Sequence, residues 1–208
     1  MPAHRTPAYR IETERLVVRC WEPADAVALK KAIDESLDHL REWMPWVDAE
    51  PEPLEAKIQR LRVFRGRFDL DQDYVYAIFD RDESIVLGGS GLHTRAGERA
   101  REIGYWIHAD HVNRGYASEA TAALTRVAFE VCDMQRVEIH CSPANRASAS
   151  VPTKLGFTHE GTLRRRGPVK EGAATDSMIW VLHADEYPHS PAASAAIEAF
   201  DAAGKKVL

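Results

Sequence analysis

Long apolar runs are missing from this sequence of 208 residues. No stretch approaches the roughly 20 consecutive apolar residues that a membrane-spanning helix needs. The opening residues, 1–7, also lack the apolar segment of a secretory signal. We therefore expect a cytoplasmic protein with no membrane partner.

Cysteine is scarce, with three widely separated residues and no Cys-x-x-Cys pair: Cys20, Cys132 and Cys141. This pattern supports neither a disulfide framework nor a zinc knuckle, and it is typical of a reducing cytoplasm. His108, Asp110 and His111 lie near one another in the sequence, but their spacing is loose and no fourth ligand is evident. We therefore expect no metal site.

An excess of positive charge is also absent, because 27 Lys and Arg face 32 Asp and Glu, a formal net charge of −5. Phosphate backbones are bound by clustered positive charge, so we expect no nucleic-acid partner. The sequence contains no Gly-x-x-x-x-Gly-Lys-Ser/Thr loop, and the glycines at 88–91 do not open a helix. Common nucleotide-binding loops are thereby excluded.

Hydrophobic residues make up 45% of the chain, enough for a sizeable core. We expect one domain over residues 1–186 and a tail over 187–208, with a small helix at 192–203. Apolar spacing predicts a mixed α/β sheet with helices on it. The predicted helices lie at 23–40, 54–68, 115–132 and 146–155, and the predicted strands at 15–21, 74–79, 84–93, 102–107, 136–141, 157–165 and 174–183.

The segment 111–120 lies between a predicted strand and a strong predicted helix. A helix N-terminus presents unpaired N–H groups, and Gly115 removes the Cβ that would hold a ligand away from them. The segment therefore suits an anion such as a pyrophosphate. The alternative is that Asn113 merely caps the helix and Gly115 eases the turn.

The segment 145–157 follows a predicted strand and contains a short predicted helix. Asn145 suits its N-cap and Gly156 its C-terminus. Pro152 falls inside the helix and cannot donate to the Ser148 carbonyl. We expect a distortion there that leaves this carbonyl free.

Several motifs together resemble the GNAT acetyltransferase superfamily, and most closely the ribosomal-protein N-acetyltransferases of the RimJ/RimL type. The motifs occur in the family's order over roughly residues 12–185, and their joint spacing is more specific than any one of them. They are Glu14-Arg15-Leu16-Val17-Val18-Arg19, Trp43-Met44-Pro45-Trp46, Glu102-Ile103-Gly104-Tyr105-Trp106-Ile107, Arg114-Gly115-Tyr116-Ala117-Ser118-Glu119-Ala120, Asn145-x-x-Ser148 and Lys154-Leu155-Gly156-Phe157.

The resemblance implies a GNAT fold: a mixed, mostly antiparallel central sheet with a splayed parallel strand pair and helices on both faces. The splayed strands would be 102–108 and 136–142, with acetyl-CoA as cofactor between them. Its pyrophosphate would lie on the amides of 113–118, and Asn145 would contact the pantetheine arm. Val112 stands where the family usually has Gln or Arg. The implied cofactor contacts are Ile107, His108, Asn113, Arg114, Gly115, Tyr116, Ala117, Ser118 and Asn145.

The same resemblance nominates two catalytic residues. Glu102 opens the strand beside the expected cleft and is the candidate base, acting directly or through water; the alternative is a surface ion pair. Ser148 would lie near the thioester sulfur; the alternative is a helix serine bonded to its own backbone. Trp43, Trp46 and Trp106 are candidates for the amine-side wall, against a role in core packing.

The expected activity is acetyl transfer from acetyl-CoA to a primary amine by direct attack, most simply a protein N-terminal α-amine. Two alternatives stay open: a small amine such as a polyamine or aminoglycoside, and a non-catalytic module that binds acyl-CoA. A cleft open at both ends would favour a peptide, and a closed acidic cup a polycation. A homodimer in which the tail is exchanged also stays open.

Overall fold

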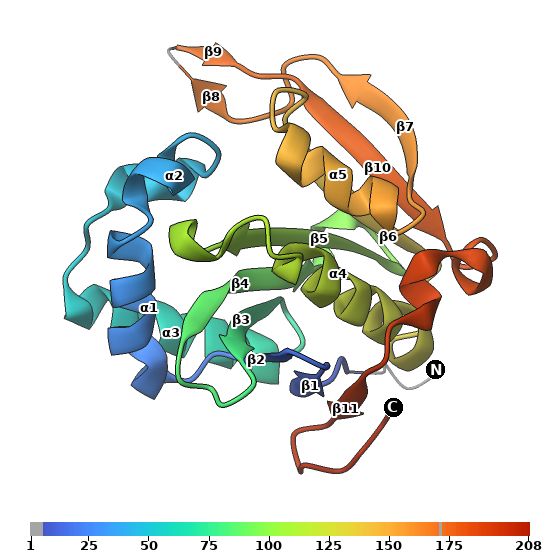
Figure 1. Ribbon diagram of the computed structural model, residues 1–208, viewed down its shortest axis with the longest axis horizontal. Coiled ribbons are helices and arrows are strands. Elements are labelled where there is room, and N and C mark those ends of the chain that lie inside the picture. Colours follow the sequence, from blue (N-terminus) through green and yellow to red (C-terminus); the bar gives the residue numbers. More distant parts are fainter. Residues whose placement is uncertain (1–5, 171) are drawn as a thin grey trace.

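The computed structural model describes residues 6–170 and 172–208, apart from the side chain of Lys170. Within these residues one mixed sheet has nine strands in the order β11-β1-β2-β3-β4-β5-β6-β10-β7, and a separate hairpin pairs β8 with β9 (Figure 1). The strands are β1 Arg10–Glu12, β2 Leu16–Cys20, β3 Tyr74–Asp80, β4 Val86–His93, β5 Ala100–Ile107, β6 Arg136–Cys141, β7 Thr158–Leu163, β8 Val169–Lys170, β9 Ala173–Ala174, β10 Ser177–His183 and β11 Glu198–Phe200.

The described helices follow the apolar spacing of the sequence, except that the single helix expected at 23–40 is a 3-10 turn, Pro23–Asp25, followed by two separate helices, α1 and α2. The helices are α1 Ala26–Asp34, α2 Leu37–Arg41, α3 Leu54–Asp69, α4 Tyr116–Arg126 and α5 Arg146–Lys154. The expected long helix at 115–132 ends as α4 at Arg126 and continues as a π-helical turn, Val127–Val131. No helix among the described residues is both long and apolar enough to span a membrane.

Helices cover both faces of the sheet. The side chains of β3 point alternately to the two faces, so the strand contributes to a core on each side. Tyr74, Tyr76 and Ile78 are buried in one core with residues of α4. Ala77 and Phe79 are buried in the other, with residues of α1 and α3. Mixed topology with helices on both faces is the expected fold class, and the structure confirms it.

The strands β5 and β6 are the parallel pair of the sheet, as the family resemblance implied. The two strands pair with each other only at their first residues. Ala100, Arg101 and Glu102 lie opposite Arg136, Val137 and Glu138. Both strands continue beyond this point, to Ile107 and Cys141, without pairing to each other. The strands therefore diverge after Glu102, which confirms the expected splay.

The C-terminal segment differs from the expected tail, and the helix predicted at 192–203 is wrong. Residues Pro191–Ser194 form a single 3-10 turn, and β11 then pairs antiparallel with β1. A helix of this length is marginal alone, whereas the edge of β1 offers unpaired backbone groups. The domain boundary at residue 186 stays a prediction.

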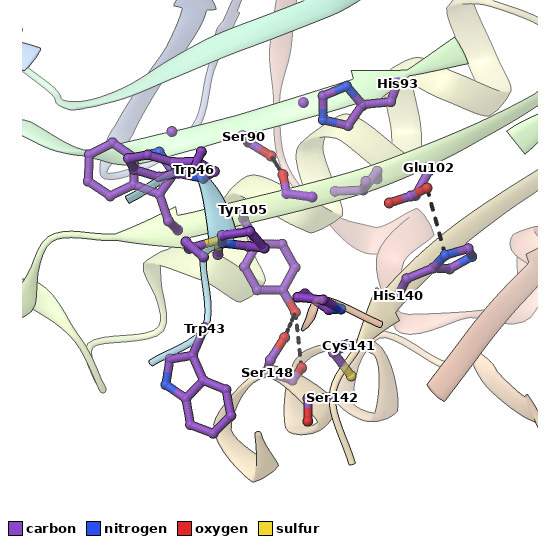
Figure 2. A pocket seen from close by; sticks show the side chains of 18 of the residues that line it. Trp43, Trp46, Ser90, His93, Glu102, Tyr105, His140, Cys141, Ser142 and Ser148 are labelled. Carbon is purple, nitrogen blue, oxygen red and sulfur yellow. Dashed lines mark hydrogen bonds and ion pairs between the residues drawn. The ribbon is translucent and has the colours of Figure 1, made fainter. Parts of the chain in front are cut away.

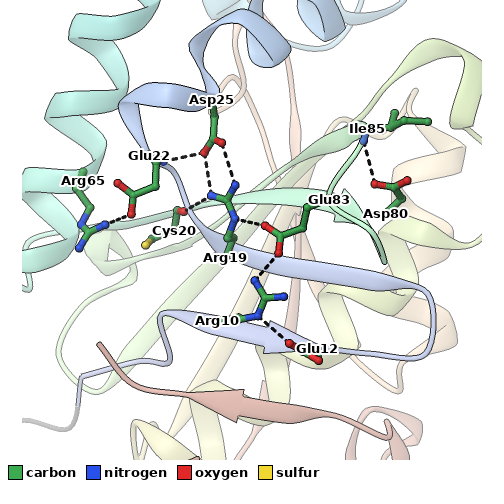
Figure 3. Close-up of polar contacts among 10 residues, drawn as sticks. All are labelled: Arg10, Glu12, Arg19, Cys20, Glu22, Asp25, Arg65, Asp80, Glu83 and Ile85. Atoms are coloured by element: carbon green, nitrogen blue, oxygen red, sulfur yellow. Dashed lines mark hydrogen bonds and ion pairs between the residues drawn. The ribbon is translucent and has the colours of Figure 1, made fainter. Parts of the chain in front are cut away.

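Charged side chains join the β1–β2 edge to the β3–β4 turn (Figure 3). Glu83 of that turn accepts from Arg10 at 2.6 Å and from Arg19 at 2.5 Å. Arg19 also donates to both oxygens of Asp25, beside the start of α1. This network connects the first strands to the helical layer that covers them.

Candidate active site

Two adjoining cavities lie where β5 and β6 separate. The first measures about 820 Å³ and lies over β4 and β5, whereas the second measures about 410 Å³ and lies between the N-termini of α4 and α5. A ligand that filled both would run from the α4 terminus to the sheet. The residues that line both are Trp43, Met44, Tyr105, Trp106, Asn145 and Ser148.

The N-terminus of α4 opens into the second cavity. Its N-cap, Gly115, has φ 82° and no side-chain cap, and Asn113 before it has φ 61°. The left-handed turn exposes the first N–H groups of the helix, an arrangement that suits an anion. The alternative interpretation, in which the Asn113 side chain caps the helix, is therefore wrong.

Most of the expected cofactor residues meet at this second cavity. Its lining includes Ile107, Asn113, Gly115, Tyr116, Ala117, Ser118 and Asn145. Arg114 and His108 line neither cavity. Arg114 donates to the Asp110 carbonyl, and buried His108 contacts Glu35 and accepts from the Asp110 amide.

The N-terminus of α5 forms the junction of the two cavities. Asn145 caps the helix as expected, because its side chain accepts from the Ser148 amide at 2.9 Å. The Ser148 carbonyl, to which Pro152 cannot donate, accepts from the Tyr105 hydroxyl at 3.0 Å. Ser148 Oγ lies 3.1 Å from the same hydroxyl (Figure 2). A pair of hydroxyl groups thus lies between the two cavities.

Tyr105 is a site residue that the sequence analysis missed. Tyr105 reaches α5 from β5, a strand remote in the sequence. The free Ser148 carbonyl implied by Pro152 was the available signal that some donor would be needed. Burial raises the pKa of Tyr105, so this hydroxyl stays protonated and can donate.

Glu102 lies at the point where β5 and β6 diverge, and it is buried rather than a surface residue. Arg95 donates to both of its carboxylate oxygens, at 2.7 and 2.5 Å. Its other neighbour is His140, whose Nδ1 lies 3.7 Å from Oε2 (Figure 2). Burial acts to raise the pKa of Glu102, but the Arg95 hydrogen bonds and the nearby positive charges outweigh it and lower that pKa.

Glycines form the floor of the first cavity where β4 and β5 pair. Gly91 lies opposite Gly104, and the ring of His93 lies over them. A Cβ at Gly91 would come within 2.2 Å of His93 Nε2, and one at Gly89 within 2.6 Å of Trp106 Nε1. The rings of His93 and Trp106 can therefore lie directly against the strand backbone only because Gly91 and Gly89 have no side chains.

All three tryptophans proposed for the amine-side wall line the first cavity. Trp46 packs edge-on against Trp106, with ring centroids 6.2 Å apart. Trp43 lines both cavities, and Figure 2 shows it beyond Tyr105, away from His93. The wall is thus aromatic on the side of α2 and the following turn, Pro45–Ala49.

Comparison with known proteins gives the class to which this site belongs. Residues 15–158 match the family model described as acetyltransferase (GNAT) domain. The [ribosomal protein uS5]-alanine N-acetyltransferase of Escherichia coli (strain K12) is 27% identical over 160 residues, which cover 74% of this chain and 81% of that protein.

Solved structures share the fold. RimL, a ribosomal L7/L12 α-N-protein acetyltransferase in complex with coenzyme A, superimposes with a TM-score of 0.74 and 20% identity, over 84% of this chain and 97% of that one. RimJ of Mycobacterium smegmatis, in complex with CoA-disulfide, gives 0.74 and 21%, over 91% and 92%.

This chain belongs to the GNAT acetyltransferase family. It is an acetyl-CoA-dependent acyltransferase that acetylates amines. The residues present fit that coenzyme, because the open α4 terminus suits a diphosphate and the unpaired edges of β5 and β6 offer backbone groups to an extended arm.

Proposed function

We propose that the acceptor is the α-amine at the N-terminus of a protein. The observation that carries this proposal is the charge balance of the first cavity, which is not an acidic cup. Glu102 is neutralised by Arg95, and Asp73 is bound to His93. A polycation needs unpaired carboxylates, whereas a peptide N-terminus with a neutral backbone does not.

Charged groups of both signs line the same cavity. The arginines are Arg60, Arg95 and Arg166, and the carboxylates are Glu42, Asp73, Glu102 and Asp176. The lining therefore carries no large excess of negative charge that would attract a polyamine or aminoglycoside, which carries several ammonium groups. The tryptophan wall suits the side chains of a peptide. The Escherichia coli relative, an alanine N-acetyltransferase of a ribosomal protein, supports the same acceptor class.

Different residues of the chain would bind the coenzyme and assist the reaction in the two cavities. The N–H groups at the start of α4 would hold the diphosphate, and Asn145 would contact the arm that leads to the junction. Acetyl-CoA, when bound, supplies a thioester there. Ser148 would lie near the sulfur. Because the Tyr105 proton goes to the Ser148 carbonyl, the Ser148 hydroxyl is the donor of their side-chain contact, and it can turn to donate a hydrogen bond to negative charge on sulfur.

Glu102 is proposed to act on the acceptor amine. Its lowered pKa keeps the carboxylate ionised near neutral pH, so it attracts an ammonium group. An α-amine has a pKa of about 8 and a lysine amine about 10.4, so an N-terminus loses its proton more readily. Because Arg95 binds both carboxylate oxygens, removal of that proton calls for a further group.

Thiol release from acetyl-CoA tests the proposal directly. The acceptors would be short peptides beginning with Ala or Ser, the same peptides with blocked N-termini, and spermidine. We expect release with the free peptides and little with the others. Preference for spermidine would identify a small-amine enzyme, and binding of coenzyme A without release for any acceptor would identify a non-catalytic module.

A further inference from the structure

Asp73 and His93 form a pair that faces the first cavity beside Glu102. His93 Nδ1 lies 3.1 and 3.0 Å from the two carboxylate oxygens of Asp73. Asp73 also accepts from the Thr94 amide at 3.3 Å. Both side chains are mostly covered, with exposed fractions of 19% for His93 and 24% for Asp73. Asp73 is therefore held both by the His93 side chain and by the Thr94 backbone.

The chemistry of this pair fixes where the proton of a neutral His93 lies. Burial acts to raise the pKa of Asp73, but the His93 contacts and the backbone N–H groups outweigh it and lower that pKa. An ionised carboxylate can only accept hydrogen bonds, so Nδ1 must donate. The lone pair of the neutral imidazole is then on Nε2. Carboxylate partners orient general-base histidines in the same way.

Nε2 is directed over the cavity floor. A Cβ built on Gly91 would lie 2.2 Å from Nε2, and one built on Gly104 would lie 3.6 Å away. Because Gly91 has no side chain, the imidazole ring occupies the space that a Cβ would take there, and its Nε2 edge lies at the floor of the cavity that His93 lines. The register places His93 opposite Glu102, the last paired residue before β5 and β6 diverge. His93 and Glu102 are thus neighbours on one face of the sheet (Figure 2).

Titratable groups on four neighbouring segments line the same cavity beside His93. Asp73 precedes β3, Arg95 follows β4, Glu102 is on β5 and His140 is on β6. Arg95 is occupied by Glu102, and His140 Nε2 contacts Glu138 at 2.7 Å. Arg95 and His140 are thus engaged with glutamates, and Nε2 of His93 is the basic nitrogen at the cavity floor.

We propose that His93 is the general base of the acetyl transfer and that Asp73 is its positioning residue. This proposal rests on the proposed function. Nε2 takes one proton from the acceptor ammonium and passes it to bulk water, which leaves a neutral amine. As the C–N bond forms, the C–S bond breaks and its electron pair leaves with sulfur. The second amine proton balances that charge and ends on the thiol.

The first test compares two acceptors in the full-length protein. An alanyl peptide must lose a proton before it attacks, whereas hydroxylamine is already largely neutral near pH 7. We expect His93→Gln to lower kcat/KM for the peptide about a hundredfold but for hydroxylamine by less than about threefold. The peptide defect should shrink at higher pH, where the α-amine loses its proton unaided. Asp73→Asn should act in the same direction, by about tenfold.

His183→Gln is the matched control. His183 also contacts a carboxylate, Glu160 at 3.3 Å, but it lines neither cavity. We expect no change of kcat/KM for either acceptor in this variant. Equal losses for both acceptors in His93→Gln would show a structural role and overturn the proposal, as would no loss. A wild-type protein that acetylates neither acceptor would overturn the proposed function itself.

The second test does not depend on turnover. Nitrogen-15 chemical shifts distinguish the two neutral tautomers of histidine. We expect His93 to be protonated on Nδ1 in the wild type and to become a mixture of tautomers in Asp73→Asn. The opposite tautomer in the wild type, with the proton on Nε2, would leave no lone pair above the glycines and would overturn the proposal.

Discussion

The hydroxyl pair of Tyr105 and Ser148 is the residue-scale feature that joins the two cavities. Removing the Ser148 hydroxyl leaves its carbonyl bonded to Tyr105, so the junction should keep its shape. We expect Ser148→Ala to lower kcat about tenfold, equivalent to about 1.4 kcal/mol of barrier, and to change the KM for acetyl-CoA less than about twofold.

Thr153→Ala is the control for that change. Thr153 is on the same helix and its hydroxyl also donates to a backbone carbonyl, that of Ala149, but it lines neither cavity. Steady-state kinetics on an accepted peptide would measure both variants. Equal kcat values for wild type and Ser148→Ala would contradict a role for this hydroxyl at the sulfur.

Sequence patterns predicted some site residues better than others, for a physical reason. Gly115 and Asn145 have local tasks, a left-handed turn and a helix cap, and local tasks leave local patterns. Tyr105, Asp73 and His93 act through partners that are remote in the sequence. Such contacts depend on strand register and on the splay, which no short pattern encodes.

The start of α4 is the element whose conformation matters most for coenzyme binding. Gly115→Ala would place a side chain at φ 82°, which costs about 1 kcal/mol, and would disturb the exposed N–H groups. We expect the KM for acetyl-CoA to rise about fivefold. Gly97→Ala imposes at least as much strain, at φ 111° and ψ −175°, in an exposed turn that lines neither cavity.

Thermal melting and acetyl-CoA kinetics of the two glycine variants separate these effects. Both should lose stability, whereas only Gly115→Ala should lose coenzyme affinity. A similar rise in KM for Gly97→Ala would attribute the effect to general destabilisation.

Elements with strong apolar spacing were predicted closely, and short ones were not. The predicted helix at 54–68 is α3, Leu54–Asp69, and the predicted strand at 136–141 is β6. β11 spans three residues, too few for a period to show, and it forms only because β1 offers an edge. Its neighbours include several alanines, which favour a helix when no such partner is considered.

At the scale of the whole molecule, ion pairs make stability depend on pH. Burial acts to raise the pKa of Glu83, but the hydrogen bonds from Arg19 and Arg10 outweigh it and lower that pKa. The folded state therefore binds fewer protons than the unfolded state, in which the pKa is about 4.3. Stability from this group is present above that value and is lost as the pH falls through the lowered pKa.

We expect Glu83→Gln to lower the free energy of unfolding by about 1 to 2 kcal/mol near pH 7, a value reduced for the partial exposure of the pair. Asp82→Asn, in the same turn but exposed, should change it little. Urea unfolding would show the Glu83→Gln difference shrinking below about pH 4, because the side chain at position 83 is then uncharged in both proteins. A constant difference across pH would contradict an ionic origin.

The pairing of β1 with β11 brings Arg10 opposite Phe200, almost the full length of the described chain apart. During synthesis the ribosome adds about 5 to 20 residues per second, so the first strand waits many seconds for this neighbour. Until β11 is synthesised, β1 is an edge strand whose unpaired backbone groups can bind other chains. Synthesis of β11, late in this sequence, thus determines when the edge of β1 is protected from misassembly.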